Sequence, residues 1–308
     1  MTRLLSAFAL AFFLLAGCGA SDERAPIGER PVQVVATTGM VADLARVIGG
    51  DRVAVEALMG PGVDPHLYRA SEGDVGRMTR ADLILYNGFH LEGKMVDLLA
   101  RLGDRAAAVA EGIDRAELLT PPEFEGNADP HVWMDVKLWQ EATTTTADAL
   151  ARIDPQHADG YRARAAAYRA EMDTLDAYVR RRVAEVPVGQ RVLVTAHDAF
   201  NYFGRSYGFE VRGLQGISTA TEAGTGDVQA LARFVAEREI PAMFVESSVS
   251  PRSIEAVRAA VRAQGHEVAI GGNLYADALG GVGSGAETYP AMIRANIDTI
   301  VDALAPAD

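Results

Sequence analysis

A long segment in the middle of the chain constrains the fold more than any other feature. Residues 155–186 contain no proline after Pro155 and a single glycine, Gly160, near their start. Proline is favoured in the first turn of a helix, and a Pro-Val-Gly sequence follows the segment. About 30 helical residues extend roughly 45 Å, more than twice the length of an average helix. We therefore predict a helix over residues 154–187 that joins two domains. Two shorter helices broken near Gly160 are the alternative.

Strand and helix patterns alternate on both sides of this segment, in residues 32–153 and 188–308. Runs of β-branched and apolar residues predict strands, and apolar residues at helical spacing predict helices. We expect strands at residues 32–36, 53–58, 81–86, 191–196, 242–246 and 267–270, and helices at residues 40–48, 72–80, 91–101, 136–153, 227–238, 252–263 and 287–304. This alternation indicates an α/β fold class: two α/β lobes with parallel sheets, joined by the long helix. In such a protein the cleft between the lobes is the expected binding site.

The first residues are typical of export. A positive charge at Arg3 is followed by an uncharged run over residues 4–17, which is too short to span a bilayer comfortably. Cys18 comes directly after Leu-Ala-Gly, which resembles the lipobox of bacterial lipoproteins and implies cleavage before Cys18 and a lipid on it. A simple signal peptide with an incidental cysteine is the alternative. Residues 1–18 are thus predicted to be a lipoprotein signal, and residues 19–31 a flexible tether.

The composition excludes several kinds of site. Cys18 is the only cysteine, so neither an internal disulfide nor a cysteine zinc site can form. The net charge of −13 argues against nucleic acid as a partner, because phosphate binding needs basic patches. The chain contains neither a Walker-type phosphate loop nor a Gly-x-Ser-x-Gly nucleophile elbow. The glycine-rich residues 280–285 are interpreted as a flexible loop.

Two of the six histidines lie in the same short motif. His66 and His131 each follow Asp-Pro and precede an apolar and then an aromatic residue, Tyr68 or Trp133. Proline fixes its own backbone and restricts the residue before it, so each imidazole is reached through a stiff turn. A stiff backbone helps to place a ligand nitrogen accurately on a metal ion. The aromatic residues are candidates for walls that limit access of water.

Two further candidates come from the second half of the chain. His197 directly follows a predicted strand, and Asp277 lies a few residues beyond another. With the two Asp-Pro-His imidazoles, they would form a four-ligand site across the cleft. Imidazoles and a carboxylate suit zinc, manganese or iron(II). As alternatives, a lone loop histidine is commonly a surface residue, and an aspartate in a glycine-rich loop commonly makes a turn.

The remaining polar candidates are assigned lesser roles. His157 is expected in solvent at the start of the long helix, and His266 in a turn. His90 is placed near the cleft but not among the ligands. Asp135 and Asp198 lie next to the ligand motifs and are candidates for orienting imidazoles.

Seven segments carry a resemblance to a known family. They are GVDPHLYRASEGDVGRM, ADLILYNGFHLEGKM, ADPHVWMD, TAHDAFNYFGRSYG, GISTATEAGTGDVQALARFV, FVESSVSPRSIEAV and LYADALG. From Val32 to its end, the chain resembles the zinc/manganese solute-binding lipoproteins of bacterial ABC importers. The resemblance implies two α/β lobes bridged by one long rigid helix, with the metal site in the cleft. It also implies His66, His131, His197 and Asp277 as the metal ligands.

The same resemblance implies a role but leaves the metal open. Manganese specialists of the family usually carry glutamate where this chain has His197, and zinc specialists often carry a histidine-rich loop that residues 118–129 lack. The implied protein is a non-enzymatic, monomeric solute-binding protein that faces the periplasm or the cell exterior. Its partners would be an ABC permease with its ATPase, and the membrane through the lipid on Cys18. Protonation of the imidazoles should weaken metal binding below about pH 6.5.

Three other functions remain as alternatives. An exported metallohydrolase could use the same histidine and aspartate set, although catalytic zinc usually keeps one position open for water. A surface adhesin stabilised by metal would be expected to unfold on chelation. A binding protein for haem or another chelated metal would need a wider cleft with more aromatic or arginine residues than these motifs suggest.

Overall fold

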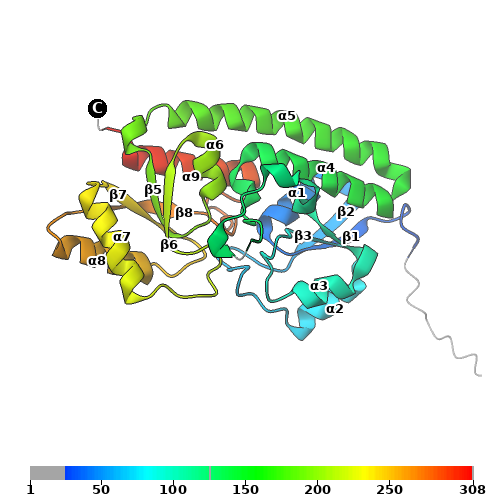
Figure 1. Ribbon diagram of the computed structural model, residues 1–308. Helices are drawn as coiled ribbons and strands as arrows, with labels where there is room; N and C mark the ends of the chain where they lie inside the picture. Colours follow the sequence, from blue (N-terminus) through cyan, green and yellow to red (C-terminus); the bar gives the residue numbers. More distant parts are fainter. Residues whose placement is uncertain (1–24, 125, 307–308) are drawn as a thin grey trace, which may run out of the picture.

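The computed structural model describes residues 25–306 except residue 125. It confirms the predicted fold class, because two α/β lobes with parallel sheets are joined by one long helix (Figure 1). Cys18, the predicted signal sequence and the first part of the predicted tether lie outside the described residues. Among the described residues, none of the helices is long and apolar enough to cross a membrane.

The first lobe is built on a four-stranded parallel sheet in the order β2-β1-β3-β4. Its elements are β1 (Val32–Ala36), α1 (Gly39–Gly49), β2 (Val53–Ala57), α2 (Glu72–Arg80), β3 (Leu83–Tyr86), α3 (Val96–Arg101), β4 (Ala106–Ala108) and α4 (Val136–Ile153). The side chain of Thr38 caps α1, and Ser71 and Asp74 form a capping box at the start of α2. These caps end the strand or loop before each helix and fix where the helix begins.

The second lobe contains two parallel strand pairs, β5-β6 and β7-β8, with β5 and β7 side by side. Its elements are β5 (Val192–His197), α6 (Asn201–Tyr207), β6 (Glu210–Gln215), α7 (Thr225–Glu237), β7 (Ala242–Glu246), α8 (Arg252–Ala263), β8 (Ala269–Leu274) and α9 (Tyr289–Leu304). All six residues of β5 are buried, which fits its apolar sequence. The carboxyl ends of β5 and β7 therefore lie at the same edge of the lobe.

Helix α5 (Ala158–Val183) is continuous over 26 residues and passes Gly160 without a break. The alternative of two shorter helices is therefore wrong. The segment does begin with a separate 3₁₀ turn, Pro155–His157. Figure 1 shows α5 lying along both lobes, and it packs against α1, α4 and α9. Its buried side chains belong to one apolar core that continues through both lobes. Because this core is shared, the lobes are held together by packing as well as by the chain connection.

Several sequence predictions need correction. The predicted strand at residues 267–270 is displaced, because β8 runs over Ala269–Leu274. The predicted helix at residues 91–101 begins only at Val96. The short elements β4, β6 and α6 were not predicted, because short runs give little periodicity to detect.

Two segments expected to be flexible make defined contacts. In the predicted tether, the guanidinium of Arg30 binds both carboxylate oxygens of Asp82, and Arg52 donates to the carbonyl of Gly28. Residues 25–31 are therefore docked on the first lobe. The glycine-rich loop closes on itself, with the amide of Gly280 donating to the carbonyl of Ala286.

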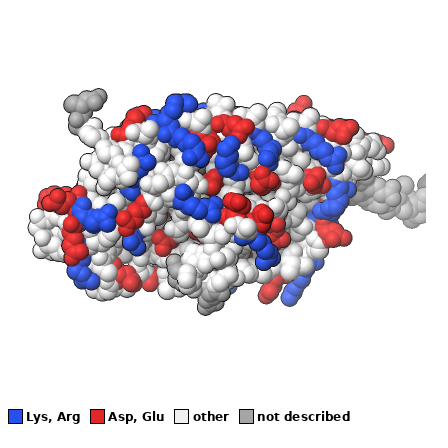
Figure 2. Space-filling view, turned by 45° about the horizontal axis from the view of Figure 1, so that its top comes forward, with Lys and Arg blue, Asp and Glu red and all other residues white. Residues whose placement is uncertain are grey.

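Some of the charged side chains on the surface form ion pairs. Figure 2 shows basic and acidic residues interspersed over the face that it presents. Arg182 on α5, for example, contacts Asp298 on α9 at 2.8 Å. Arg169 on the same helix contacts Glu141 on α4 at 3.0 Å. Exposed pairs of this kind contribute little to stability individually, so the apolar core is the main support of the helix layer.

Candidate metal centre

The structure brings His66, His131, His197 and Asp277 together in a buried cluster. One ligand atom of each residue can be chosen such that all four lie within 4.8 Å of one another. Nε2 of His66 lies 3.3 Å from Nε2 of His131, and Nε2 of His197 lies 3.2 Å from Oδ2 of Asp277. The arrangement joins two histidines of the first lobe to a histidine and an aspartate of the second. It lies where the two lobes meet, as the sequence predicted.

Each Asp-Pro-His motif closes a local turn. Oδ1 of Asp64 accepts the backbone amide of His66 at 2.8 Å, and Oδ1 of Asp129 accepts that of His131 at 3.0 Å. An aspartate that binds the amide two residues later is a common turn device. The intervening proline restricts the same turn further, so both imidazoles leave the backbone in a fixed direction.

The two proposed ligands of the second lobe, His197 and Asp277, lie at or just beyond the ends of strands. His197 is the last residue of β5, and Asp277 lies three residues beyond the end of β8 at Leu274. The carbonyl of Ala276 accepts a hydrogen bond from the indole of Trp133 at 2.9 Å. This contact fixes the loop that carries Asp277 against the segment that carries His131.

Two buried carboxylates orient two of the imidazoles. Oδ1 of Asp129 lies 2.7 Å from Nδ1 of His131, and Oε2 of Glu246 lies 2.6 Å from Nδ1 of His197. Since a carboxylate accepts, the proton is assigned to Nδ1 in both rings. In the neutral form of each ring, Nε2 then has its lone pair facing the cluster, as a metal ligand requires.

The electrostatics of the cluster are strongly shifted. Burial opposes the charged form of His131, but Asp129 and Asp277 outweigh it and raise the pKa of His131 to about 9. Burial likewise opposes charge on His197, yet Glu246 and Asp277 raise its pKa well above the usual value. Burial opposes ionisation of Asp277, but the neighbouring imidazoles hold its pKa well below the usual range. His66 differs, because burial lowers its pKa to about 3.

Several buried polar atoms of the cluster point at each other without a hydrogen bond. They are Nε2 of His197 and both carboxylate oxygens of Asp277. Buried polar atoms almost always have partners, and a bound ion is one reason for an exception. A cation at the centre would satisfy all three atoms at once and neutralise Asp277. The donor set of three imidazoles and one carboxylate therefore fits a divalent transition metal.

The orienting residues differ from those expected from the sequence. Asp135 caps α4 and accepts a hydrogen bond from Ser206, and Asp198 accepts the amide of Gly213 at 2.8 Å. The imidazole partners are instead Asp129 and Glu246. The doubled Asp-Pro-His motif could have indicated Asp129, and the position of Glu246 at the end of β7 could have indicated the other.

The aromatic residues after the two motifs have different roles. The ring of Trp133 is fully buried and its centroid lies 5.2 Å from that of His131, so it forms a wall of the cluster. The hydroxyl of Tyr68 instead donates to Asp74 at the start of α2.

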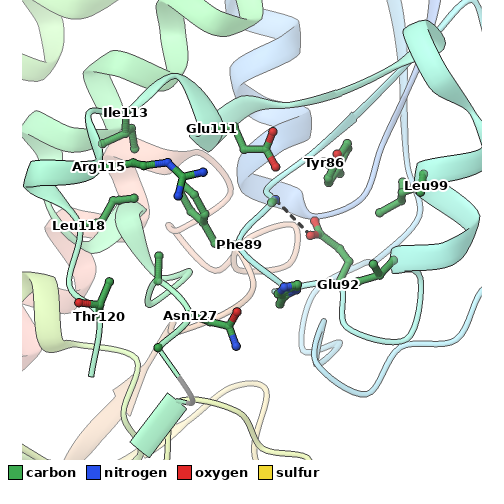
Figure 3. A pocket seen from close by; sticks show the side chains of 16 residues that line it. Tyr86, Phe89, Glu92, Leu99, Glu111, Ile113, Arg115, Leu118, Thr120 and Asn127 are labelled. Atoms are coloured by element: carbon green, nitrogen blue, oxygen red, sulfur yellow. Dashed lines mark hydrogen bonds between the residues drawn. The ribbon is translucent and has the colours of Figure 1, made fainter. Parts of the chain in front are cut away.

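The remaining histidines lie outside the cluster. His157 contacts Asp154 at the start of the long helix, at 2.9 Å, and His266 lies near the carbonyl of Ile240. His90 is exposed and lines a cavity of about 500 Å³ in the first lobe. Figure 3 shows this cavity between Tyr86, Phe89, Glu92 and Arg115. None of the four clustered residues lines the cavity, so it is separate from the metal centre.

The cavity is nevertheless connected to the cluster through hydrogen bonds. Glu92 is buried and accepts the amides of Asn87 and Gly88, the latter pair being visible in Figure 3. The side-chain amide of Asn87 donates to the carbonyl of Pro130, immediately before His131. The buried carboxyl thus supports the loop that contacts the second Asp-Pro-His motif.

The fold and the cluster together define a two-lobed α/β protein whose buried imidazoles and carboxylate fit a metal ion, and comparisons with known proteins agree with this class. The family described as zinc-uptake complex component A, periplasmic, matches residues 34–303. The manganese-binding lipoprotein MntA of Bacillus subtilis (strain 168) is 48% identical over 304 residues, which cover 98% of each chain. The zinc-binding protein TroA of Treponema pallidum (strain Nichols) is 51% identical over 274 residues, which cover 88% of each chain.

A solved structure shows the same similarity in three dimensions. The periplasmic zinc binding protein TroA from Treponema pallidum matches with a TM-score of 0.87 at 50% identity, over 90% of this chain and 100% of that chain. The chain therefore belongs to the zinc-uptake complex component A family, the zinc/manganese solute-binding proteins of ABC importers that its motifs resemble.

Proposed function

We propose that this protein captures a divalent transition metal, zinc or manganese, and delivers it to the membrane permease of an ABC importer. His66, His131, His197 and Asp277 are the proposed ligands. The metal exchanges its water shell for three neutral imidazoles and one ionised carboxylate. The permease then collects the metal from the cleft between the lobes.

One observation carries this proposal. The buried oxygens of Asp277 and Nε2 of His197 have no hydrogen-bond partner, while the outer nitrogens of two imidazoles are held by buried carboxylates. Leaving buried polar atoms unpaired costs about 1–3 kcal/mol each, more where a group is charged. A bound cation would remove this cost by giving these atoms a partner. The relatives named for zinc or manganese binding support the same conclusion.

The test is a competition titration of the metal-free protein with zinc and manganese against a chromophoric chelator. We expect one metal ion to bind per chain. His197→Ala should abolish binding, and His266→Ala, a histidine outside the cluster, should leave binding unchanged. Equal metal affinity in the His197→Ala variant and the parent protein would remove the proposed site.

The chemistry of the site admits both metals. Zinc outbinds manganese at most nitrogen-rich sites, in accord with the Irving–Williams order. Both oxygens of Asp277 face imidazole nitrogens, at 3.4 Å from His131 and 3.2 Å from His197. The carboxylate can therefore bind through one oxygen or two, and a second oxygen provides the higher coordination number that manganese favours. We expect tighter binding of zinc and usable binding of manganese.

The geometry favours binding over catalysis. A catalytic zinc usually keeps three protein ligands and one open position for water. Here four protein groups converge, and each is at most 3% exposed. The relatives are binding proteins, which supports a non-enzymatic role. Hydrolysis of ester or phosphate substrates above the background of the free metal would favour the metallohydrolase alternative.

We further propose export, lipid attachment at Cys18, and action as a monomer beside a permease and its ATPase. The relative from Bacillus subtilis is named a lipoprotein, and the sequence before Cys18 fits a lipobox. The proposed organisation is a signal over residues 1–18, a linker over residues 19–31, lobes at residues 32–153 and 188–308, and a linking helix over residues 154–187. Mass spectrometry of the mature protein would detect the lipid, and Cys18→Ser should prevent its attachment.

A further inference from the structure

The three imidazoles among the proposed ligands are held unequally, and His66 is the least restrained of them. His131 and His197 each have a buried carboxylate on Nδ1. Within the described part of the chain, Nδ1 of His66 has no such carboxylate partner. The next residue, Leu67, is 48% exposed, whereas Val132 after His131 is fully buried. His66 therefore lies in a loop between β2 and α2 that reaches the surface, and among the described residues no carboxylate fixes its ring from behind.

His131 is attached to the second lobe although it belongs to the first in sequence. The segment that carries it is bonded to the second lobe at several points. Asp129 accepts hydrogen bonds from the side chains of Asn201 and Tyr202, and the indole of Trp133 donates to the carbonyl of Ala276. These contacts are buried or partly buried, so His131 should remain with His197 and Asp277 when the lobes move apart.

Within residues 25–306 except residue 125, one side-chain hydrogen bond ties the turn that carries His66 to the second lobe. Oδ1 of Asp64 accepts the amide of His66 at 2.8 Å, and Oδ2 of the same carboxylate accepts the hydroxyl of Thr219 at 2.6 Å. Thr219 lies in the loop between β6 and α7 of the second lobe. Asp64 therefore joins the backbone of one ligand to the opposite side of the cleft.

We propose that Asp64 and Thr219 form a latch that couples separation of the lobes to release of His66, which is the first ligand to leave the metal. This inference rests on the proposed function. When the lobes separate, Thr219 withdraws from Asp64 and the turn that presents His66 loses its fixed partner. The metal is then held by His131, His197 and Asp277, with one coordination position free for a group of the permease. Thr219 and Asp64 are thus positioning residues for the release step.

The first test measures how fast metal leaves. Thr219→Val keeps the shape of the side chain but removes the hydroxyl donor. Zinc dissociation into excess chelator, followed by stopped flow, should become about tenfold faster, on the scale of one charge-assisted hydrogen bond. Thr221→Val, an exposed threonine in the same loop, should leave the rate unchanged. Thr219→Ser, which retains the hydroxyl, should restore the parent rate. Equal rates for the Thr219→Val variant and the parent protein would overturn the latch.

The second test requires no metal. Hydrogen exchange of the metal-free Thr219→Val variant should be faster in residues 60–70 and unchanged around His131. Unchanged exchange in residues 60–70 would contradict the latch. An equal increase in the exchange rate around His131 would also contradict the latch, because the latch acts only on the turn that carries His66. A parent protein that binds no metal would refute the proposed function, and the exchange pattern would still decide whether the latch exists.

Discussion

The carboxylate of Glu246 lies 2.6 Å from Nδ1 of His197, and its other oxygen accepts the backbone amides of His197 and Ala196. One buried side chain at the end of β7 therefore fixes both the ring and the backbone of a proposed ligand at the end of β5. Because these strands are neighbours, the relationship comes directly from the parallel arrangement of the second lobe.

Replacing this carboxylate should weaken metal binding without removing a ligand. We expect Glu246→Gln to reduce zinc affinity by about 10–100-fold, since loss of an orienting carboxylate has effects of that size in other metal sites. A competition titration against the parent protein measures the change. Glu255→Gln, on the exposed side of α8, is the matched control and should bind as the parent does. Unchanged affinity in Glu246→Gln would show that His197 needs no such partner.

Removal of the carboxylate ligand itself should have a larger effect. Asp277→Ala deletes the only negative charge among the four proposed ligands, so we expect affinity to fall by more than about 100-fold, beyond the range for orienting residues. Isothermal titration with zinc, and separately with manganese, measures the loss. If the variant bound either metal within tenfold of the parent protein, Asp277 would not be a ligand.

Metal binding near neutral pH should release protons. Neighbouring carboxylates raise the pKa of His131 to about 9 and that of His197 well above its usual value, so both rings favour the protonated form more than ordinary imidazoles do. His66, with its pKa lowered to about 3, favours the neutral form. The metal needs neutral imidazoles, so binding should expel protons from the rings of His131 and His197, and affinity should fall as pH decreases below about 9, the pKa of His131.

Calorimetry in buffers of different ionisation enthalpy counts these protons directly. The raised pKa values therefore place the pH dependence of metal affinity well above pH 6.5, which is about the value expected for ordinary imidazoles. An apparent affinity that is constant from pH 9 to 7 would contradict the raised pKa values of His131 and His197.

The metal-free protein should remain folded, and metal should stabilise it further. The apolar core runs from the first lobe through α5 to α9 without including the four ligands. Metal at about 100 times its dissociation constant contributes about 2.7 kcal/mol, which should raise Tm by roughly 5 °C. Differential scanning fluorimetry in the presence of chelator, and separately of metal, measures the Tm of the metal-free and of the metal-bound protein. Loss of the cooperative transition in chelator would favour the metal-stabilised adhesin.

The identical Asp-Pro-His motifs show how far local sequence determines this site. In both copies the aspartate binds the amide two residues later, as the turn chemistry alone dictates. Oδ2 of Asp64, however, accepts the hydroxyl of Thr219, whereas Oδ2 of Asp129 accepts the side-chain amide of Asn201, and Oδ1 of Asp129 also contacts the ring of His131. The motif fixes the turn, and the surroundings decide which partner the remaining carboxylate oxygen finds.

The sequence by itself determined the elements with strong periodicity, the long helix and the stiff turns of the two Asp-Pro-His motifs, and the family resemblance indicated the four ligand candidates. These features depend on local propensity, on buried apolar faces and on rigid turns, all of which are written in contiguous residues. Only the tertiary structure decided that Glu246 orients His197, that the His131 segment is bonded to the second lobe, and that Asp64 reaches Thr219. Each of these contacts joins residues about 50 or more positions apart along the chain. Such pairs arise when strands and lobes pack together, and no local pattern specifies them.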